Sequence, residues 1–373
     1  MTASSNSLLG RATAGATADY HGRHGGAPGR VRTFAGLSLS SVGLGTYLGE
    51  DTDEVDALFA ESIRRALERG FNVLDAAINY RSQRSERVIG RVVGEAVAAG
   101  VVKREEVVVA TKAGYIPYDG ARPSNYAAYV EERYLWTGII ARDQLVSGVH
   151  CMSPRYLEDQ IDRSRANLRL ETIDIYYLHN PESHLEGVSR EEFMGRLRAA
   201  FATFEKAVSD GRIANYGTAT WHGFRKAPTD PVYHSLVEFL DVAREVGGAD
   251  HHFKVVQLPY NLAMPEAHSF ANQRLRDGRV VPFLQAAREL GIYVMASAPI
   301  LQGQLTERLP DEVRIPLGLE TDSQRALQFV RSTPGIGTAL AGMKRALHVD
   351  ENAAVEQVPP VDSVTLEKLF ELA

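Results

Sequence analysis

Four residues at or near the ends of apolar segments carry the chemistry that this sequence offers. Asp75 and Tyr80 lie in VLDAAINY, Lys112 ends VVVATK, and His179 ends IDIYYLH. If these segments are neighbouring strands of a parallel barrel, their C-terminal ends converge on one mouth, so distant residues form one site. A tyrosine beside a lysine, a carboxylate and a histidine has the composition of a tuned proton donor, and no nucleophile is needed.

The lysine is the residue expected to tune the tyrosine. A free phenol titrates near ~10, and a nearby ammonium favours the phenolate, so Lys112 is expected to lower the pKa of Tyr80. Asp75 would pair with Lys112, and His179 would donate a hydrogen bond to the oxygen that the tyrosine protonates. Singly, these residues also fit a helix cap, a solvated lysine and a buried core histidine. Their joint occurrence at successive strand ends favours a catalytic site.

Composition excludes several classes of protein. The chain has 373 residues, 44% of them hydrophobic, which is enough for one large barrel. A formal net charge of -6 argues against a nucleic-acid-binding protein, which needs clustered basic residues. No apolar run reaches the ~18 residues of a membrane span. The single cysteine, Cys151, cannot form an internal disulfide, so we expect a cytoplasmic protein in which Cys151 is a small buried hydrophobe.

The order of the elements predicts the α/β class and a closed (β/α)8 TIM barrel. Strand-like and helix-like segments alternate eight times, as in βαβ units. The expected strands are residues 41–46, 72–77, 107–112, 173–179, 215–220, 255–261, 293–299 and 336–342. The expected helices are residues 53–70, 84–99, 154–168, 190–210, 232–246, 280–290, 322–332 and 346–356. An open doubly wound sheet is the alternative, but no GxGxxG follows the first strand.

The N-terminal region is expected to lie outside the barrel strands. Residues 1–30, rich in Ala, Gly, Ser and Arg, are interpreted as a flexible leader, and residues 31–373 as a single barrel domain. The alternative places Tyr20 and His21 over the bottom or flank of the barrel. VRTF and LSLS, separated by Ala35-Gly36, predict an N-terminal hairpin that plugs the bottom of the barrel.

Two long connections leave strand ends at the mouth. Residues 113–153 form a loop insertion after the third strand, and their aromatic content favours ordered packing as one wall of the mouth. Residues 300–320 follow the seventh strand and are expected to fold over a bound cofactor.

Together these segments resemble the aldo-keto reductase superfamily over roughly residues 37–356. The motifs are VGLGT at 42–46, GFNVLDAAINY at 70–80, ATK at 110–112, IDIYYLHNP at 173–181, NYGTAT at 215–220, VVQLPYN at 255–261 and AGMKRALHVDEN at 341–352. The family's tetrad of Asp, Tyr, Lys and His falls on the four residues named above. The resemblance implies an oxidoreductase that transfers hydride from NADPH to an aldehyde or ketone, with NADH not excluded, while Tyr80 protonates the carbonyl oxygen. It implies neither a metal nor a flavin.

The resemblance also implies a cofactor groove across the mouth. Gln257 matches the glutamine near the nicotinamide carboxamide. Lys344 and His348 suit a 2′-phosphate, and their place at the start of the last helix fits this role because the N–H groups of a helix N-terminus attract phosphate. The expected groove residues are Gly45, Thr46, Asp75, Ala219, Thr220, Gln257, Ser297, Ile300, Gln302, Gly303, Gly342, Met343, Lys344, His348, Glu351 and Asn352.

Two parts of the family pattern are altered. Ala219 and Thr220 replace a serine and an asparagine at the carboxamide, and Ser297 replaces the tyrosine that stacks on the nicotinamide. After Tyr80, residues 81–86 lack the usual glycine and are longer by two residues. One hypothesis is that Arg81 or Arg84 in this longer loop binds an anionic or polyhydroxy substrate, and the alternative is a solvated pair.

The substrate end of the mouth is expected to bind a small carbonyl compound. Apolar walls with a few polar groups are typical of such pockets. The expected lining residues are Tyr115, Trp136, Asn180 and Trp221, with Glu182 beside them. The large insertion favours a bulky substrate, such as a glycosylated or polycyclic ketone, although the aromatic residues also fit a packing role.

Two other functions are weighed against a reductase. A cofactor-binding sensor or regulatory subunit with little turnover would explain the altered nicotinamide positions, but it does not require an intact tetrad. A metal-dependent barrel enzyme would use His150, His179 or the His251-His252 pair. Metal sites need several converging ligands, and His251-His252 precede a strand at the opposite end of the barrel.

Overall fold

A closed barrel of eight parallel strands forms the centre of the molecule. The computed structural model describes residues 7–371. The strands follow one another around the barrel in the order β11-β12-β3-β4-β5-β6-β7-β8. They are β3 (Val42–Gly45), β4 (Val73–Asp75), β5 (Val108–Ala113), β6 (Ile173–His179), β7 (Ile213–Ala219), β8 (Phe253–Pro259), β11 (Tyr293–Ser297) and β12 (Thr338–Gly342). The predicted (β/α)8 fold is confirmed, and each predicted strand lies within a few residues of an observed one.

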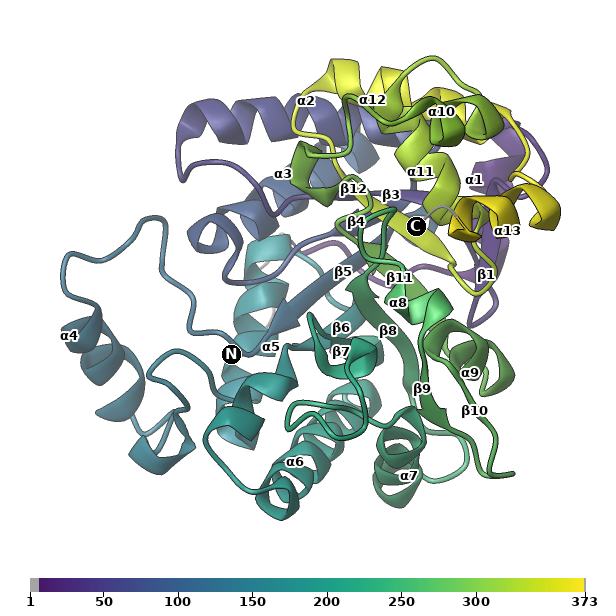
Figure 1. Cartoon of the computed structure of the whole chain (residues 1–373). Helices are drawn as coiled ribbons and strands as arrows, with labels where there is room; N and C mark the ends of the chain where they lie inside the picture. Colours follow the sequence, from purple (N-terminus) through teal and green to yellow (C-terminus); the bar gives the residue numbers. More distant parts are fainter. Residues whose placement is uncertain (1–6, 372–373) are drawn as a thin grey trace.

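Eight helices surround the barrel, one after each strand (Figure 1). They are α2 (Asp53–Arg69), α3 (Arg84–Ala98), α5 (Pro154–Leu168), α6 (Arg190–Ser209), α7 (Leu236–Gly247), α9 (Phe283–Glu289), α11 (Asp322–Ser332) and α12 (Ala346–Ala353). Helix α2 shows why these segments are helical. Thr52 caps its first turn and Gly70 ends it in the left-handed conformation. Its apolar face, including Phe59 and Ile63, is buried against the barrel.

Alternation along the strands separates the inside of the barrel from its outer face. The inward row contains apolar residues low in the barrel, such as Val73, Ala110 and Ile175, which pack together in one cluster. One step of two residues further along the same strands come Asp75, Lys112 and Tyr177. The polar residues of the site therefore stand on an apolar plug at the C-terminal ends of the strands.

The predicted hairpin closes the bottom of the barrel. β1 (Val31–Phe34) pairs antiparallel with β2 (Leu37–Ser40), and Ala35 and Gly36 both have positive φ angles in the turn between them. Phe34, Leu37 and Leu39 belong to the same apolar cluster as the lower interior of the barrel.

The described part of the predicted leader contains a packed helix, whereas the sequence pattern predicts a flexible segment. Residues Ala14–His24 form helix α1, in which the Tyr20 side chain is fully buried and its hydroxyl donates to the carbonyl oxygen of Leu67 at 2.6 Å. Arg23 makes a two-bond ion pair with Glu106 at 2.9 and 3.0 Å. The structure thus agrees with the alternative in which Tyr20 lies against the barrel, because burial of its ring stabilises the helix. Residues 1–6 of the predicted leader lie outside the described residues.

Further elements lie outside the barrel strands and the eight helices that follow them. They are α4 (Tyr126–Val130), α8 (Glu266–Ser269), α10 (Asp311–Leu317), α13 (Ser363–Glu371) and an unpredicted hairpin of β9 (Ala271–Arg274) and β10 (Val280–Pro282). In Figure 1 the insertion after β5, with α4, projects to the left of the barrel. Its tyrosines pack edge to face, and Tyr134 contacts Tyr156 of α5. The expected packed order of the insertion is confirmed. Among residues 7–371, no helix is both long and apolar enough to cross a bilayer.

Replacing the buried ring of Tyr20 tests whether α1 is part of the folded domain. Tyr20→Ala should lower the free energy of unfolding by about 3 kcal/mol, because it leaves a cavity and an unpaired carbonyl group at Leu67. Urea unfolding followed by far-UV circular dichroism measures the change. The exposed neighbour Asp19 provides the control. Equal stability of Tyr20→Ala and Asp19→Ala would contradict a packed role for α1.

Candidate active site

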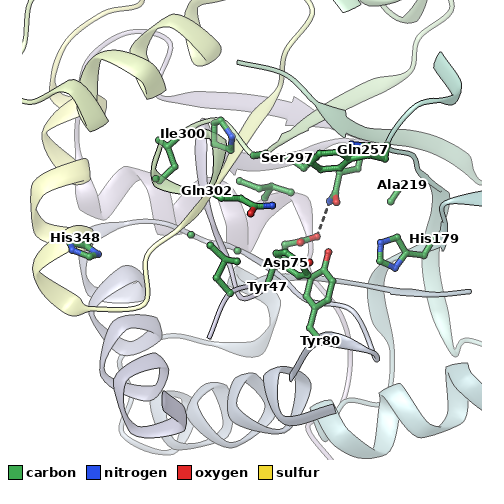
Figure 2. Close-up of a pocket in the computed structure, with 18 of the residues that line it drawn as sticks. Tyr47, Asp75, Tyr80, His179, Ala219, Gln257, Ser297, Ile300, Gln302 and His348 are labelled. Atoms are coloured by element: carbon green, nitrogen blue, oxygen red, sulfur yellow. Dashed lines mark hydrogen bonds between the residues drawn. The ribbon is translucent and has the colours of Figure 1, made fainter. Parts of the chain in front are cut away.

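A buried ion pair forms the floor of the site. The Lys112 ammonium lies 2.7 Å from Asp75 Oδ2 and donates to the carbonyl oxygen of Ala76 at 2.6 Å. The other carboxylate oxygen, Oδ1, accepts from Gln257 Nε2 at 2.9 Å (Figure 2). Lys112 is completely buried and Asp75 is 4% exposed. Burial lowers the pKa of Lys112, and the carboxylate of Asp75 opposes that shift by favouring the ammonium. The strand ends therefore bring together three of the predicted residues.

Tyr80 stands directly above this pair. The Lys112 ammonium is 4.7 Å from the centre of its ring, and the His179 ring lies edge-on at 5.9 Å between centroids. The four predicted catalytic residues are thus brought together. The expected direction of the tyrosine pKa shift is wrong, however. Burial, followed by the negative charge of Asp75, raises the pKa of Tyr80 well above its usual value. Desolvation outweighs the lysine because Asp75 largely balances the charge of Lys112.

His179 is a neutral imidazole. Burial, with the nearby positive charge of Lys112 and with His150, holds the pKa of His179 well below its usual value. Its Nδ1 atom is buried and has no hydrogen-bond partner among the described residues. A neutral ring offers one donor and one acceptor nitrogen, so His179 can hydrogen-bond to an oxygen in the pocket without carrying charge.

A chain of hydrogen bonds supports the backbone of His179 from behind. Arg196 donates to His184 Nδ1 at 3.0 Å, because a guanidinium cannot accept. His184 Nε2 must then donate to His150 Nδ1 at 2.9 Å, and His150 Nε2 to the carbonyl oxygen of His179 at 2.6 Å. Each histidine in the chain has one defined tautomer. The next residue, Asn180, turns away from the strand with φ 45° and ψ 57°, so the chain of hydrogen bonds holds β6 where the strand breaks.

One pocket of about 780 Å³ connects these residues with the rest of the mouth. It runs from Tyr80 and His179 past Gln257 to His348 on α12 (Figure 2). The predicted site residues that line it are Gly45, Asp75, Tyr80, Tyr115, His179, Asn180, Ala219, Thr220, Trp221, Gln257, Ser297, Ile300, Gln302, Gly303, Gly342, His348, Glu351 and Asn352. Most of the predicted groove therefore lies on one continuous surface.

A few predicted residues do not line the pocket. Lys112 is covered by Tyr80 and acts from below. Thr46 is buried, and its carbonyl oxygen accepts from Ser85 at 2.8 Å. Met343 is fully buried under α2, while Lys344 lies beside the pocket at the approach to α12.

Two of the predicted substrate residues are wrongly placed. The Trp136 side chain is 73% exposed, and it is absent from the pocket because the insertion folds back on its own tyrosines. Glu182 is buried, and its Oε1 accepts from the backbone N–H groups of Trp221 at 2.7 Å and His222 at 2.9 Å. Burial alone would raise the pKa of Glu182, but the nearby His234, whose Nε2 lies 3.7 Å from Oε2, and the backbone N–H groups hold it below the usual value. Glu182 thus fixes the loop that carries Trp221 and does not face a substrate.

The substrate end is lined by uncharged side chains. Asn180 Nδ2 donates to the Tyr115 hydroxyl at 3.1 Å, and Tyr115 lies edge-on to His179 at 5.2 Å. Three lining residues at this end were not predicted from the sequence, namely Tyr47, Leu48 and Asn79. The sequence indicated these residues only by their position, because each follows a strand end within a few residues. Other lining residues without a predicted role are Ala298, Pro299, Thr306, Ser323 and Leu340.

Neither Arg81 nor Arg84 faces the pocket, so the hypothesis that one of them binds substrate is wrong. The Arg81 side chain is almost fully buried and pairs with Asp56 at 2.5 Å, and Arg84 pairs with Asp53 and with Asp56 at 2.7 Å. The longer loop instead folds into a left-handed turn. Arg81, Ser82 and Gln83 have φ angles of 48°, 53° and 70°, which costs roughly 1 kcal/mol or more for each residue other than glycine. Backbone strain of this kind next to Tyr80 needs compensating contacts.

The histidines of the metal hypothesis do not form a metal site. Within residues 7–371, no group of three or more His, Cys, Asp or Glu side chains has the arrangement to hold a metal ion. Cys151 is completely buried, as predicted, and burial raises the pKa of its thiol.

The chain is similar to known proteins in sequence and in fold. The sequence profile of the Aldo/keto reductase family matches residues 41–316. The aldo-keto reductase YhdN of Bacillus subtilis is 24% identical over 279 residues, which cover 73% of this chain and 63% of the relative. Prostaglandin F synthase 1 of Bos taurus is 25% identical over 154 residues, covering 41% of this chain and 36% of the relative. The 6-dehydroglucose reductase of Novosphingobium aromaticivorans is 26% identical over 191 residues, which cover 50% of this chain and 49% of the relative. The matches span less than two thirds of each relative's length.

Solved structures extend the likeness of the fold to nearly the whole chain. An aldo-keto reductase from Klebsiella pneumoniae in complex with NADPH has a TM-score of 0.61 at 17% identity, covering 92% of this chain and 94% of that one. The glycerol dehydrogenase of Gluconobacter oxydans has a TM-score of 0.62 at 18% identity, covering 93% and 95%. At this level of identity, the comparison establishes the fold.

Lys112→Met tests the energetics of the buried pair without reference to catalysis. The variant should lower the free energy of unfolding by about 3 to 5 kcal/mol, because it leaves the carboxylate of Asp75 buried without its cation. Adding Asp75→Asn should recover part of this loss, which urea unfolding measures. Lys206→Met removes one partner of an exposed pair and should cost below about 1 kcal/mol. The absence of any recovery in the double variant would argue against coupling.

The buried histidines predict a loss of stability in mild acid. Burial lowers the pKa of His150 to about 4 and that of His184 to about 3, from 6.5. Below pH ~6.5 the unfolded chain binds protons at these positions and the folded chain does not, so the free energy of unfolding should fall from pH ~6.5 towards ~4. His184→Gln keeps a donor and an acceptor but cannot titrate, and it should flatten this fall in urea unfolding series. The exposed His222→Gln should keep the wild-type slope, and an unaltered slope in His184→Gln would refute the assignment.

Proposed function

The chain belongs to the Aldo/keto reductase family, and on that premise we propose that it is an NADPH-dependent oxidoreductase that reduces an aldehyde or ketone to an alcohol. The observation that carries this proposal is the placement of Tyr80 above the buried Lys112–Asp75 pair and beside a neutral His179, all at one pocket. A pocket built only to bind a cofactor has no need of a proton donor supported in this way.

The residues of the site suit proton delivery during reduction. Because burial raises the pKa of Tyr80, the phenol carries its proton at neutral pH and is ready to donate it to a carbonyl oxygen. The Lys112 ammonium, 4.7 Å from the ring centre, would stabilise the phenolate that remains. His179 would position the carbonyl oxygen by donating a hydrogen bond from its neutral ring. The reduced nicotinamide, when bound, supplies the hydride.

The groove has free polar groups where the cofactor would lie. Thr220 Oγ1 is buried without a partner among the described residues and lies in the pocket wall near Gln257. It would therefore hydrogen-bond to the nicotinamide carboxamide in place of the asparagine that is usual in the family. At the other end, neither Lys344 nor Arg345 has an acidic partner within 4.0 Å in the described chain, and His348 follows on α12. Two unpaired cations at a helix start suit a phosphate, and for this reason we favour NADPH over NADH.

The substrate end favours an uncharged carbonyl compound. Its walls combine aromatic rings at Tyr47, Tyr115 and Trp221 with the amides of Asn79 and Asn180. Asn79 Oδ1 is buried without a hydrogen-bond partner among residues 7–371 and would accept from a substrate hydroxyl. Flat apolar faces with amide groups suit a bulky ketone that carries hydroxyl groups, such as a glycosylated one. We place the reaction in the cytoplasm, since the single cysteine is buried and no disulfide stabilises the fold.

Tyr80→Phe tests the proposed proton donor. The variant should reduce carbonyl turnover by at least about 100-fold, because only the acidic hydroxyl is removed. The affinity for NADPH should stay within about twofold of wild type, since Tyr80 would contact mainly the carbonyl group. Trp221 lines the pocket, so tryptophan fluorescence reports NADPH and NADH binding, and absorbance of the reduced cofactor reports turnover with a panel of aldehydes and ketones.

Three outcomes separate the functions. NADPH binding with turnover that Tyr80→Phe abolishes supports the reductase. NADPH binding without turnover on a broad panel that includes bulky hydroxylated ketones favours the sensor. Turnover that persists in Tyr80→Phe requires a different acid and would overturn the assigned mechanism.

A further inference from the structure

The left-handed turn after Tyr80 contacts a second segment that lines the pocket. Residues 47–51, which we call the strap, run from the end of β3 to Thr52, the cap of α2. Tyr47 and Leu48 of the strap line the pocket, and they are 54% and 43% exposed. The Tyr47 ring stands edge-on to the Tyr80 ring at 4.9 Å between centroids (Figure 2). The strap therefore forms the wall that faces the proton donor.

The strap has almost no hydrogen bonds of its own. Across the described residues, the hydrogen bonds that reach residues 47–51 come from the turn. Arg81 Nε donates to the carbonyl oxygen of Glu50 at 3.0 Å, and the Ser82 hydroxyl donates to Asp51 Oδ2 at 2.5 Å. Arg81 Nη2 also donates to the carbonyl oxygen of Thr52 at 3.3 Å and to Asp56 at 2.5 Å. The same guanidinium group thus ties the end of the strap to helix α2.

The turn makes close contacts on both of its sides. Gly49 has a φ of 126°, and a Cβ atom there would lie 2.7 Å from Val55 and 3.6 Å from Arg81 Nε, so the strap passes closely over Arg81. On the other side, the Ser82 carbonyl oxygen accepts from the N–H of Gly120 at 2.8 Å, and Gln83 Nε2 donates to the carbonyl oxygen of Tyr118 at 2.6 Å. The turn is therefore joined both to the strap and to the insertion.

We propose that the turn Arg81–Gln83 is a positioning device in which Arg81 holds the strap, and through it Tyr47, against Tyr80 to shape the carbonyl-binding end of the pocket. This inference rests on the proposed reductase function. Arg81 touches neither the reacting atoms nor the pocket, so it acts through the strap. A strained backbone maintained by surrounding contacts at the edge of a site is consistent with this role.

Arg81→Ala with the matched control Arg84→Ala tests the proposal. Both changes remove an arginine that pairs with Asp56, but only Arg81 bonds to the strap. Hydrogen–deuterium exchange of the full-length protein without ligand should show faster exchange of the N–H groups of Thr46, Val55 and Asp56, which are hydrogen-bonded at the two ends of the strap, in Arg81→Ala and a wild-type rate in Arg84→Ala. With a carbonyl substrate and saturating NADPH, Arg81→Ala should raise KM by about tenfold and change kcat by less than about threefold.

Two further variants keep the test decisive. Ser82→Ala removes only the bond to Asp51 and should change exchange and KM in the same direction but less, in case Arg81→Ala folds poorly. Arg81→Lys keeps a cationic donor at a single nitrogen atom, Nζ, and should bring KM part of the way back to the wild-type value. Unchanged exchange at both ends of the strap in Arg81→Ala overturns the proposal, as does faster exchange there with a wild-type KM, or an equal KM change in Arg84→Ala. If the wild-type protein reduces no carbonyl compound, the proposed function is wrong. The exchange measurement would still decide whether Arg81 holds the strap.

Discussion

The rest of the site depends on the buried contact between Lys112 and Asp75. An isolated charge at this depth would be strongly unfavourable, but each group satisfies the other, and Ala76 and Gln257 complete the hydrogen bonds. The pair comes from adjacent strands, β5 and β4, so it forms only when the barrel closes in its observed register. It places a fixed positive charge under the Tyr80 ring while leaving the net local charge near zero. This balance explains why burial, and not the lysine, sets the direction of the tyrosine pKa.

The walls above this floor are held by buried polar groups that face away from the pocket. Glu182 binds the backbone N–H groups of the loop with Trp221, and the histidine chain from Arg196 supports the carbonyl group of His179. Arg81 does the same for the strap. In each case a loop or a strand end without regular hydrogen bonding gains partners from a charged or polar side chain behind it. Loops held in this way can present aromatic residues such as Tyr47 at fixed positions.

The barrel and its centre could be predicted because their patterns are local or periodic. Alternating apolar residues define strands, helix caps such as Thr52 and Gly70 define ends, and strand ends in a parallel barrel share one face. Gly217 illustrates a constraint that sequence only hints at: a Cβ atom there would lie 1.8 Å from the carbonyl oxygen of Val255, at a point where β7 and β8 shift register. The departures of Ala219, Thr220 and Ser297 from the family pattern were also visible in the sequence, since they depend on residue identity alone.

The sequence by itself therefore determined the fold class, the grouping of Asp75, Tyr80, Lys112 and His179, and most of the residues that line the pocket, because most of them lie at or near a strand or helix end whose place is set by local pattern. Tertiary structure alone decided the rest. Trp136 turns away from the pocket, Glu182 faces backbone groups, and Arg81 points behind the site, while Tyr47 enters it. These are loop residues, and the direction of a loop side chain follows from contacts with segments distant in the chain, which no local spacing records. The pKa of Tyr80 belongs to the same class, since desolvation depends on everything that packs around the ring.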